Sequence, residues 1–309
     1  ADLTIMEEAS ELIGRLKNGG ALPMITSCSP GWIKYCEHYQ KDFIPNLSSC
    51  KSPHEMEGAM IKSYYAEKTG IDPKDIAVVS VMPCTAKKFE AKRPELSHNG
   101  LADVDVVITT RELARMIKEA GIDFPNLPDE NFDSLLGEST GASVIFGATG
   151  GVMEAALRTA YNMITGKELE QVDLTAVRGV EGIKEASVQV GDLTVNVAVA
   201  NGTANAAKLL AQVRSGEKQY HFIEVMGCPG GCVTGGGQPI VSAQKRMECD
   251  PRAVRAAALY REDANKPLRR SHENPEIKAL YADYLGAPNS HKAHELLHTT
   301  YTARAKYSK

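Results

Sequence analysis

The sequence predicts an α/β protein with mostly parallel sheets, followed by a helical C-terminal segment. β-branched apolar runs, such as residues 76–81 (IAVVSV), alternate with helical patterns of about 10–15 residues, which is typical of βαβ units. After about residue 250 the strand patterns disappear, while charged helical stretches continue, broken near Pro267 and Pro288. We therefore expect a first domain over residues 1–249 and a helical segment over residues 250–309.

Composition excludes several classes of function. No apolar run approaches the roughly 20 residues that a membrane helix requires, so we expect no membrane insertion. The net charge of −4 argues against a nucleic-acid surface. The seven cysteines are an odd number in a chain of 309 residues, which favours reduced thiols or metal ligation over a disulfide framework. We therefore expect a reducing, cytoplasmic setting.

Periodicity orders the elements of the first domain. Helical spacing predicts helices over residues 4–16, 52–68, 111–120, 152–164 and 203–213. Apolar or alternating runs predict strands over residues 22–26, 76–81, 104–109, 143–146, 193–200 and 221–226. The loop GATGG at residues 147–151 lacks the spacing of a dinucleotide-binding fingerprint, so no nucleotide site is predicted there.

Cysteines follow three of the predicted strands. Cys28 comes after the first strand, Cys84 after the second, and Cys228 and Cys232 after the last. Ligands of open α/β sheets gather beyond the carboxyl ends of strands, so these thiols are expected to converge. Thiolates suit zinc or an iron–sulfur cluster. Zinc is the main competitor, although the chain has no matched C-x2-C pair and no paired histidines. Taken singly, each cysteine is more commonly a buried apolar residue.

Two groups of charged residues remain open to a structural or a functional interpretation. Lys87 and Glu90 follow Cys84 closely, and from spacing alone they fit a solvated helix face. Glu8 and Glu11 share a helix face with Arg15, which from spacing alone fits an exposed ion pair. A lysine beside a metal can instead hold an anionic group.

Three motifs resemble the signature motifs of iron-only (FeFe) hydrogenases. They are TSCSPGW (26–32), MPCTAKKFE (82–90) and EVMGCPGGCVTGGGQP (224–239). FGATGGVMEAALR (146–158) and SSCKSPHEM (48–56) are also similar to that family, and residues 284–301 are similar to its helical small-subunit segment. The resemblance implies two α/β lobes with a cluster between them, reversible reduction of protons to hydrogen, electrons from ferredoxin or a partner subunit, and maturation proteins for the two-iron site.

The resemblance also implies a cofactor and its ligands. The H-cluster of this family is a cubane four-iron cluster joined by one cysteine to a two-iron site that carries CO, cyanide and a dithiolate amine. By motif, the cubane ligands would be Cys84, Cys228 and Cys232, with Cys232 as the bridging thiolate. Lys87, paired with Glu90, would bind a cyanide. The pocket around the two-iron site would be completed by Met82, Met226 and Phe146.

A proton path is the third implication. In the family it runs from a cysteine beside the cluster through Glu, Ser, Glu and Arg. The matching residues, in the expected order, are Cys28, Glu11, Ser48, Glu8 and Arg15. Each proton must pass between groups about one hydrogen bond apart, and a buried carboxylate with a raised pKa can accept it. With this resemblance, a relay role for the two glutamates outranks the exposed ion pair.

The sequence departs from the family pattern in two respects. Ser29 stands where the fourth cubane cysteine is usual, and a serine oxygen is a harder, poorer ligand for iron than a thiolate. Either Ser29 ligates weakly, or Cys28 becomes a ligand and the relay loses its thiol, or the cluster is altered or absent. We also expect residues 1–249 to be an N-terminally incomplete catalytic domain. The alternatives are a non-enzymatic relative like the iron–sulfur assembly factors, and a hydrogen-sensing domain.

Overall fold

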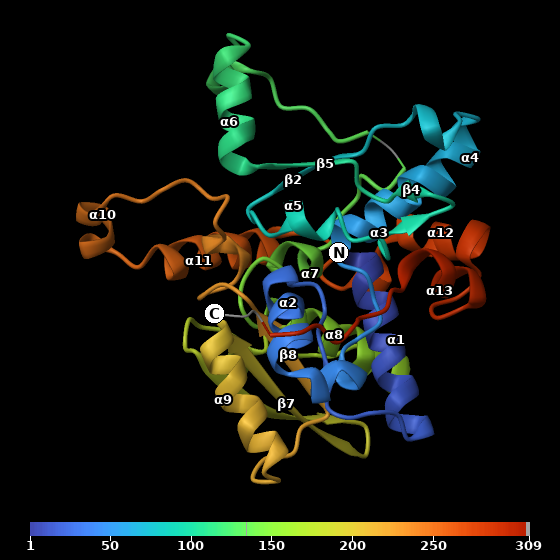
Figure 1. Ribbon diagram of the computed structural model, residues 1–309, viewed down its shortest axis with the longest axis vertical. Coiled ribbons are helices and arrows are strands. Elements are labelled where there is room, and N and C mark those ends of the chain that lie inside the picture. Colours follow the sequence, from blue (N-terminus) through green and yellow to red (C-terminus); the bar gives the residue numbers. More distant parts are fainter. Residues whose placement is uncertain (134, 307–309) are drawn as a thin grey trace.

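A four-stranded sheet occupies the lower half of Figure 1, with the strand order β1-β8-β7-β6. The computed structural model describes residues 1–133 and 135–306. The strands of this sheet are β1 (Met24–Ile25), β6 (Ile183–Val190), β7 (Leu193–Asn201) and β8 (Phe222–Met226). β1 and β7 both pair in parallel with β8, while β6 pairs antiparallel with β7. The mostly parallel sheet was predicted, and β6 is an additional strand.

Helices cover both faces of this sheet. One face packs on α1 (Asp2–Asn18) and α8 (Gly151–Thr165), and the other packs on α2 (Pro30–Tyr39) and α9 (Thr203–Arg214). Along β7, Val197 and Val199 point into the first core, while Ala198 and Ala200 point into the second. This alternation follows from the two-residue period of a strand, and both faces are apolar because both are buried.

A second lobe lies in the upper half of Figure 1 around a two-stranded parallel sheet. Its small core consists of Val78, Val104 and Val107. The elements of this lobe are α3 (Pro53–Met60), a π-helical turn (Ile61–Tyr65), α4 (Ala66–Thr69), β2 (Val79–Met82), α5 (Lys87–Glu90), β3 (Ser97–His98), β4 (Leu101–Ala102), β5 (Val106–Thr109) and α6 (Thr110–Glu119). Two lobes built on separate sheets agree with the predicted architecture.

The strand predicted over residues 143–146 is wrong. This segment belongs to the short helix α7 (Gly141–Ile145), which packs against α11 (Pro251–Asn265). Glycine at position 141 permits this packing, because a Cβ atom there would lie 2.0 Å from Asp263 Oδ1 on α11. A short apolar run fits a strand or a buried helix equally well, so tertiary packing decided its conformation.

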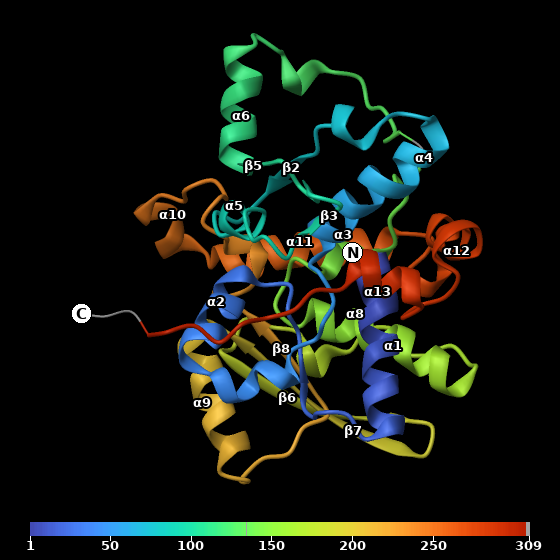
Figure 2. The same ribbon diagram turned by 45° about the vertical axis from the view of Figure 1, so that its right-hand side comes forward.

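The C-terminal segment is helical, as predicted. Its helices are α11, α12 (Pro275–Leu280) and α13 (His291–Leu297), with a π-helical turn at Tyr281–Leu285. The short helix α10 (Ala243–Glu248) precedes the segment, within the first predicted domain. Leu280, Leu296 and Leu297 pack on α3 in a shared apolar core. Beyond α13 the chain runs across the front of the molecule in Figure 2 and reaches α2, where Arg304 N–H donates to the Glu37 carbonyl (2.8 Å). Short 3₁₀ turns occur at Lys41–Asn46, Pro73–Asp75, Phe124–Asn126, Thr175–Val177, Cys232–Thr234 and Ser271–Glu273. None of the described helices is long and apolar enough to span a bilayer.

A buried ionic cluster fastens α11 to α8. The guanidinium of Arg158, which has no exposed surface, donates to Glu154 on its own helix (2.6 Å) and to both oxygens of Asp263 (3.0 and 2.9 Å). Arg178 and Arg269 complete the cluster, since they bind Glu154 and Asp263 respectively. Removing one partner of such a buried network leaves a charge without compensation.

Replacement of Arg158 should therefore be costly. We expect Arg158→Ala to lower the free energy of unfolding by about 3 kcal/mol, because two carboxylates lose a buried donor. Arg115 is the matched control, since it forms the same i,i+4 pair with Glu119 on the exposed surface, where such pairs contribute less than about 1 kcal/mol. Denaturant titration of both variants measures the difference, and equal losses would contradict this account of the cluster.

Candidate functional site

The three cysteine-bearing loops meet around one cavity of about 280 Å³. Two of the loops leave the four-stranded sheet after β1 and β8, and the third leaves the second lobe after β2. The predicted site residues that line this cavity are Cys28, Ser29, Met82, Cys84, Lys87, Phe146, Met226, Cys228 and Cys232. The argument from strand ends predicted the convergence of the four cysteines, and the family resemblance implied the other five residues. The individual roles of all nine stay predictions.

Glycines bring the cysteine loops into close contact. Gly231 has φ +96°, and a Cβ atom there would lie 2.7 Å from the backbone nitrogen of Thr149. At Gly235 a Cβ atom would lie 2.1 Å from the carbonyl oxygen of Pro83, the residue before Cys84. A side chain at either position would push the loop away from its neighbour. The Gly236 N–H also donates to Cys228 and opposes the rise in pKa that burial gives this thiol.

Ser29 faces the same cavity at the position where a fourth thiol was expected. It is the N-cap residue of α2, yet its hydroxyl makes no cap bond and instead accepts from the Gly227 N–H (3.0 Å). Besides the Cys28 thiol, the cavity therefore offers the thiols of Cys84, Cys228 and Cys232 together with the Ser29 hydroxyl. This donor set fits an iron–sulfur group, for which thiolates are the usual ligands, with an oxygen donor at one corner.

Lys87 is buried beside the cavity and carries a fixed charge. Its ammonium donates to the Cys28 carbonyl (3.0 Å) and to Glu90 Oε2 (2.6 Å). Burial alone would lower the pKa of Lys87, but Glu90 outweighs that effect and raises it. Burial would likewise raise the pKa of Glu90, but Lys87 and His54 hold it below its usual range. Both groups are therefore charged, and a solvated helix face is excluded for them.

His54 is a residue of this site that the sequence argument missed. Its Nε2 donates to the same Glu90 oxygen that binds Lys87 (2.6 Å), and its other ring nitrogen contacts the Ser80 hydroxyl (3.0 Å). It also lines the cavity. The only available signal was its place in the motif SSCKSPHEM, because a lone histidine has no distinctive spacing.

The predicted relay residues lie one after another from the cavity toward the surface, but the two glutamates lie in the opposite order to that expected. Glu8 is the inner one, since it is buried and its charge acts on Cys28. Ser48 contacts Glu8 and donates to Glu11 Oε2 (2.8 Å). Glu11 is the outer one, held by Arg15 (2.7 Å) near the surface. The helix causes this order, because Glu8 lies one turn closer to the cavity than Glu11.

Burial sets the protonation of the inner end of this line. Desolvation raises the pKa of Glu8 to about 8, with further contributions from the neighbouring carboxylates of Glu11 and Glu224. Desolvation, followed by the charge of Glu8, raises the pKa of the Cys28 thiol well above its ordinary value. A thiol that keeps its proton therefore stands beside a carboxyl group that exchanges one near neutral pH.

Family models match most of the chain. Residues 1–236 match the C-terminal domain of the iron-only hydrogenase large subunit, and residues 249–304 match the iron hydrogenase small subunit. The chain belongs to the iron-only hydrogenase family. It is 51% identical to iron hydrogenase 1 of Clostridium pasteurianum over 97% of this chain and 52% of that protein. It is 53% identical to the NADP-reducing hydrogenase subunit HndD of Solidesulfovibrio fructosivorans over 99% of this chain and 52% of that protein.

Solved structures of the family share the fold. A single-residue variant of the FeFe hydrogenase HydA1 from Chlamydomonas reinhardtii superposes with a TM-score of 0.85 at 47% identity, over 98% of this chain and 83% of that one. More distant relatives include the cytosolic iron–sulfur assembly component 3 of Pongo abelii, which is 31% identical over 99% of this chain and 65% of that protein. The chain spans about half the length of the two hydrogenase relatives it matches.

The raised pKa of Glu8 predicts a pH-dependent stability. The contribution of neutral Glu8 is fully present below about pH 4.5 and is lost progressively as the pH rises to about 8. Between pH 5 and 8, the wild type should therefore lose more than about 1 kcal/mol of unfolding free energy relative to Glu8→Gln. Denaturant titrations at both pH values test this, with Glu119→Gln as the exposed control. Parallel curves for wild type and Glu8→Gln would contradict the assignment.

Proposed function

We propose that this chain is a hydrogenase catalytic domain that interconverts protons and hydrogen at an H-cluster. The observation that carries the proposal is the convergence of four thiols and a buried ammonium on one cavity, at the inner end of a line of proton-carrying groups. When bound, the H-cluster would pass electrons between a redox partner and the protons and would supply the metal chemistry of hydrogen formation. The membership of the chain in the iron-only hydrogenase family supports this function.

The cavity residues take distinct tasks in this proposal. Cys84, Cys228 and Cys232 would hold the cubane part, with Cys232 as the thiolate shared with the two-iron site, and Ser29 would offer an oxygen as the fourth ligand. The ammonium of Lys87 binds an anionic cyanide ligand, because Glu90 keeps it charged and fixed in place. Met82, Met226 and Phe146 provide apolar walls that exclude water.

Protons move along the residues that the fold connects. Cys28 holds a proton at the cavity wall, and the Glu8 carboxyl restores it after transfer. The Ser48 hydroxyl links Glu8 to Glu11, and Arg15 fixes the outer carboxylate near the surface. Removing Cys28, Glu8, Ser48 or Glu11 lengthens a transfer step, which a proton then crosses poorly.

The competing functions fit this line of groups less well. Assembly factors share cysteines with hydrogenases, and such proteins are among the distant relatives. An assembly factor, however, has no need of a thiol, two carboxyl groups and a serine leading from the cavity toward the surface. A hydrogen sensor of this family usually lacks the relay cysteine, whereas Cys28 is present here.

We propose ferredoxin or an electron-transferring subunit as the electron partner and maturation proteins as the source of the two-iron site. A relative named as a subunit of an NADP-reducing hydrogenase supports the subunit alternative. We also propose a reducing, cytoplasmic location. All seven cysteines lie among the described residues and none forms a disulfide, which supports a reducing setting.

Anaerobic reconstitution tests the function directly. The full chain is loaded with iron, sulfide and a synthetic two-iron complex, after which infrared spectra and hydrogen evolution are recorded. We expect CO and cyanide bands together with hydrogen production from reduced viologen. A loaded chain without these bands and without hydrogen would refute the proposal.

Cys28→Ala tests the inner proton donor. We expect hydrogen evolution to fall at least about 100-fold, which is the usual scale for a lost proton-transfer group, while the infrared bands persist. Cys36→Ala is the matched control, because Cys36 is a buried cysteine that packs between α2 and the four-stranded sheet away from the cavity. Undiminished activity in Cys28→Ala would show that another group delivers the proton.

Ser29 variants test the fourth ligand position. We expect Ser29→Cys to retain more iron per chain after reconstitution and desalting than the wild type, because a thiolate binds iron more strongly than a hydroxyl. Ser29→Ala should retain less iron than the wild type. Iron analysis and electron paramagnetic resonance measure both effects. Equal iron in all three proteins would place the fourth ligand elsewhere.

A further inference from the structure

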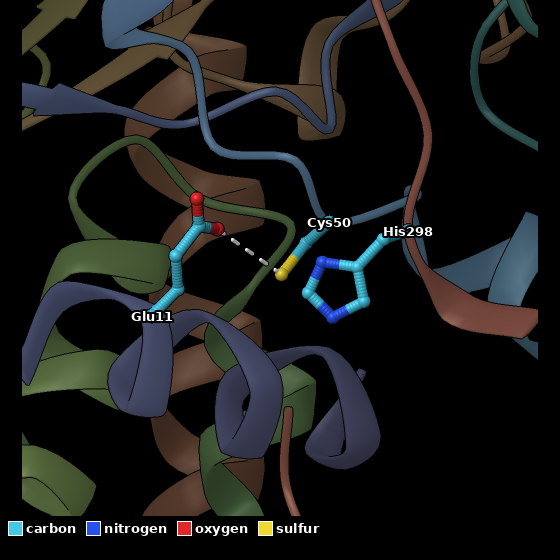
Figure 3. A group of neighbouring side chains, drawn as sticks. All are labelled: Glu11, Cys50 and His298. Carbon is cyan, nitrogen blue, oxygen red and sulfur yellow. Dashed lines mark hydrogen bonds between the residues drawn. The ribbon is translucent and has the colours of Figure 1, made fainter. Parts of the chain in front are cut away.

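Three metal-binding side chains meet at the outer end of the proton line. They are Glu11 on α1, Cys50 in the segment before α3, and His298 after α13, and their ligand atoms all lie within 4.8 Å of one another. Figure 3 shows the sulfur of Cys50 between the Glu11 carboxylate and the His298 ring. The thiol contacts Glu11 Oε2 at 3.6 Å, and the backbones of Cys50 and His298 form an antiparallel bridge.

The fold fixes His298 in the orientation that a metal ligand requires. Its Nε2 lies 3.1 Å from Glu7 Oε2. Glu7 is buried and also accepts from the Tyr281 hydroxyl and the Asn289 N–H, so it acts as an acceptor. Nε2 therefore carries the proton, and Nδ1 is an acceptor: it accepts from the Ser49 hydroxyl (2.8 Å) and lies on the side of the ring that faces Cys50 in Figure 3. A metal at Nδ1 would replace the bond to Ser49. A carboxylate behind a histidine is the usual outer support of a zinc-bound imidazole.

We infer that Glu11, Cys50 and His298 form a binding site for Zn²⁺ that interrupts the proton line when it is filled. One thiolate, one imidazole and one carboxylate are three protein ligands of the kinds that zinc prefers, with a fourth position left for water. Ligand atoms of tetrahedral zinc lie about 3.5 Å apart, so the donors need only small movements. Binding replaces the thiol proton of Cys50 by the metal and releases that proton to solvent.

The surrounding charges favour a divalent cation. Glu7 and Glu11 lie one turn apart on α1, and Arg15 is the cation bound to Glu11. Arg15 holds Glu11 Oε1, so Oε2 is the oxygen directed toward Cys50. Oε2 is also the acceptor for the Ser48 hydroxyl. A metal on Oε2 therefore occupies the lone pair through which Ser48 exchanges protons with Glu11, and its effect on catalysis rests on the proposed function.

Zinc retention tests the site without reference to activity. The cluster-loaded chain, whose cavity thiols are occupied, is incubated with Zn²⁺ and desalted, and bound zinc is counted by mass spectrometry. We expect Cys50→Ala and His298→Gln to retain one equivalent less than the wild type. Cys36→Ala and His291→Gln are the controls, with a buried cysteine and an exposed histidine removed elsewhere. Equal zinc in all five proteins would overturn the inference.

X-ray absorption at the zinc edge provides a second readout. We expect the zinc in the wild type to have one sulfur ligand and two or three nitrogen or oxygen ligands. A zinc ion without a sulfur ligand would overturn the site. Thermal unfolding followed by circular dichroism checks each variant, and Cys50→Ser replaces Cys50→Ala if the latter does not fold. Glutamine at position 298 keeps a donor for Glu7, so His298→Gln is the conservative variant.

Inhibition by zinc separates this inference from the proposed function. We expect Zn²⁺ to suppress hydrogen evolution by the wild type, and His298→Gln to need at least tenfold more zinc for half-inhibition. If zinc binds at the site and hydrogen evolution is unchanged, the claim that zinc interrupts the proton line is wrong. If no protein evolves hydrogen, the proposed function fails while the retention measurement still decides the site. If the wild type evolves hydrogen and all the proteins retain equal zinc, the zinc site is refuted while the proposed function stands.

Discussion

The buried ammonium of Lys87 is the interaction on which the geometry of the cavity depends. It joins the two lobes, because Lys87 follows a strand of the small sheet and its acceptor, the Cys28 carbonyl, follows a strand of the large one. Burying an ammonium costs several kcal/mol unless it is paired and hydrogen-bonded. Glu90 and the Cys28 carbonyl offset that cost only when the two lobes are correctly placed against each other. The contacts that compensate the buried charge therefore also align the cysteine loops.

The same physics produces opposite behaviour in two buried glutamates. Glu90 accepts from Lys87 and His54, and these donors keep its pKa low in spite of burial. Glu8 has carboxylates as neighbours, and within the described residues its Oε2 has no hydrogen-bond partner. Its pKa rises to about 8. One glutamate is therefore a permanent counter-ion and the other can exchange protons near neutral pH, although both are buried carboxyl groups.

The parts of the site that could be predicted depend on local rules. Parallel strands deliver their carboxyl ends to one edge, so Cys28 and Cys228 had to approach each other once β1 and β8 were recognised. The order of Glu8 and Glu11 could not be predicted from their spacing, because spacing does not show which end of the helix lies nearer the cavity. His54 and His298 were missed for a related reason. Each is a lone histidine whose partner lies far along the chain, at Glu90 and at Glu7.

The C-terminal segment helps to position a residue of the proposed proton path. The segment that carries Ser48 has little regular structure of its own, and it is held between α1 and the chain beyond α13. Lys51 N–H donates to the Leu297 carbonyl (2.8 Å), and Thr299 N–H donates to the Ser49 carbonyl (2.7 Å). These two bonds flank Cys50 and fix the backbone next to Ser48. The hydroxyl that joins the two glutamates is thus positioned by residues far along the chain, as the contact of Ser49 with His298 (separated by 249 positions) shows.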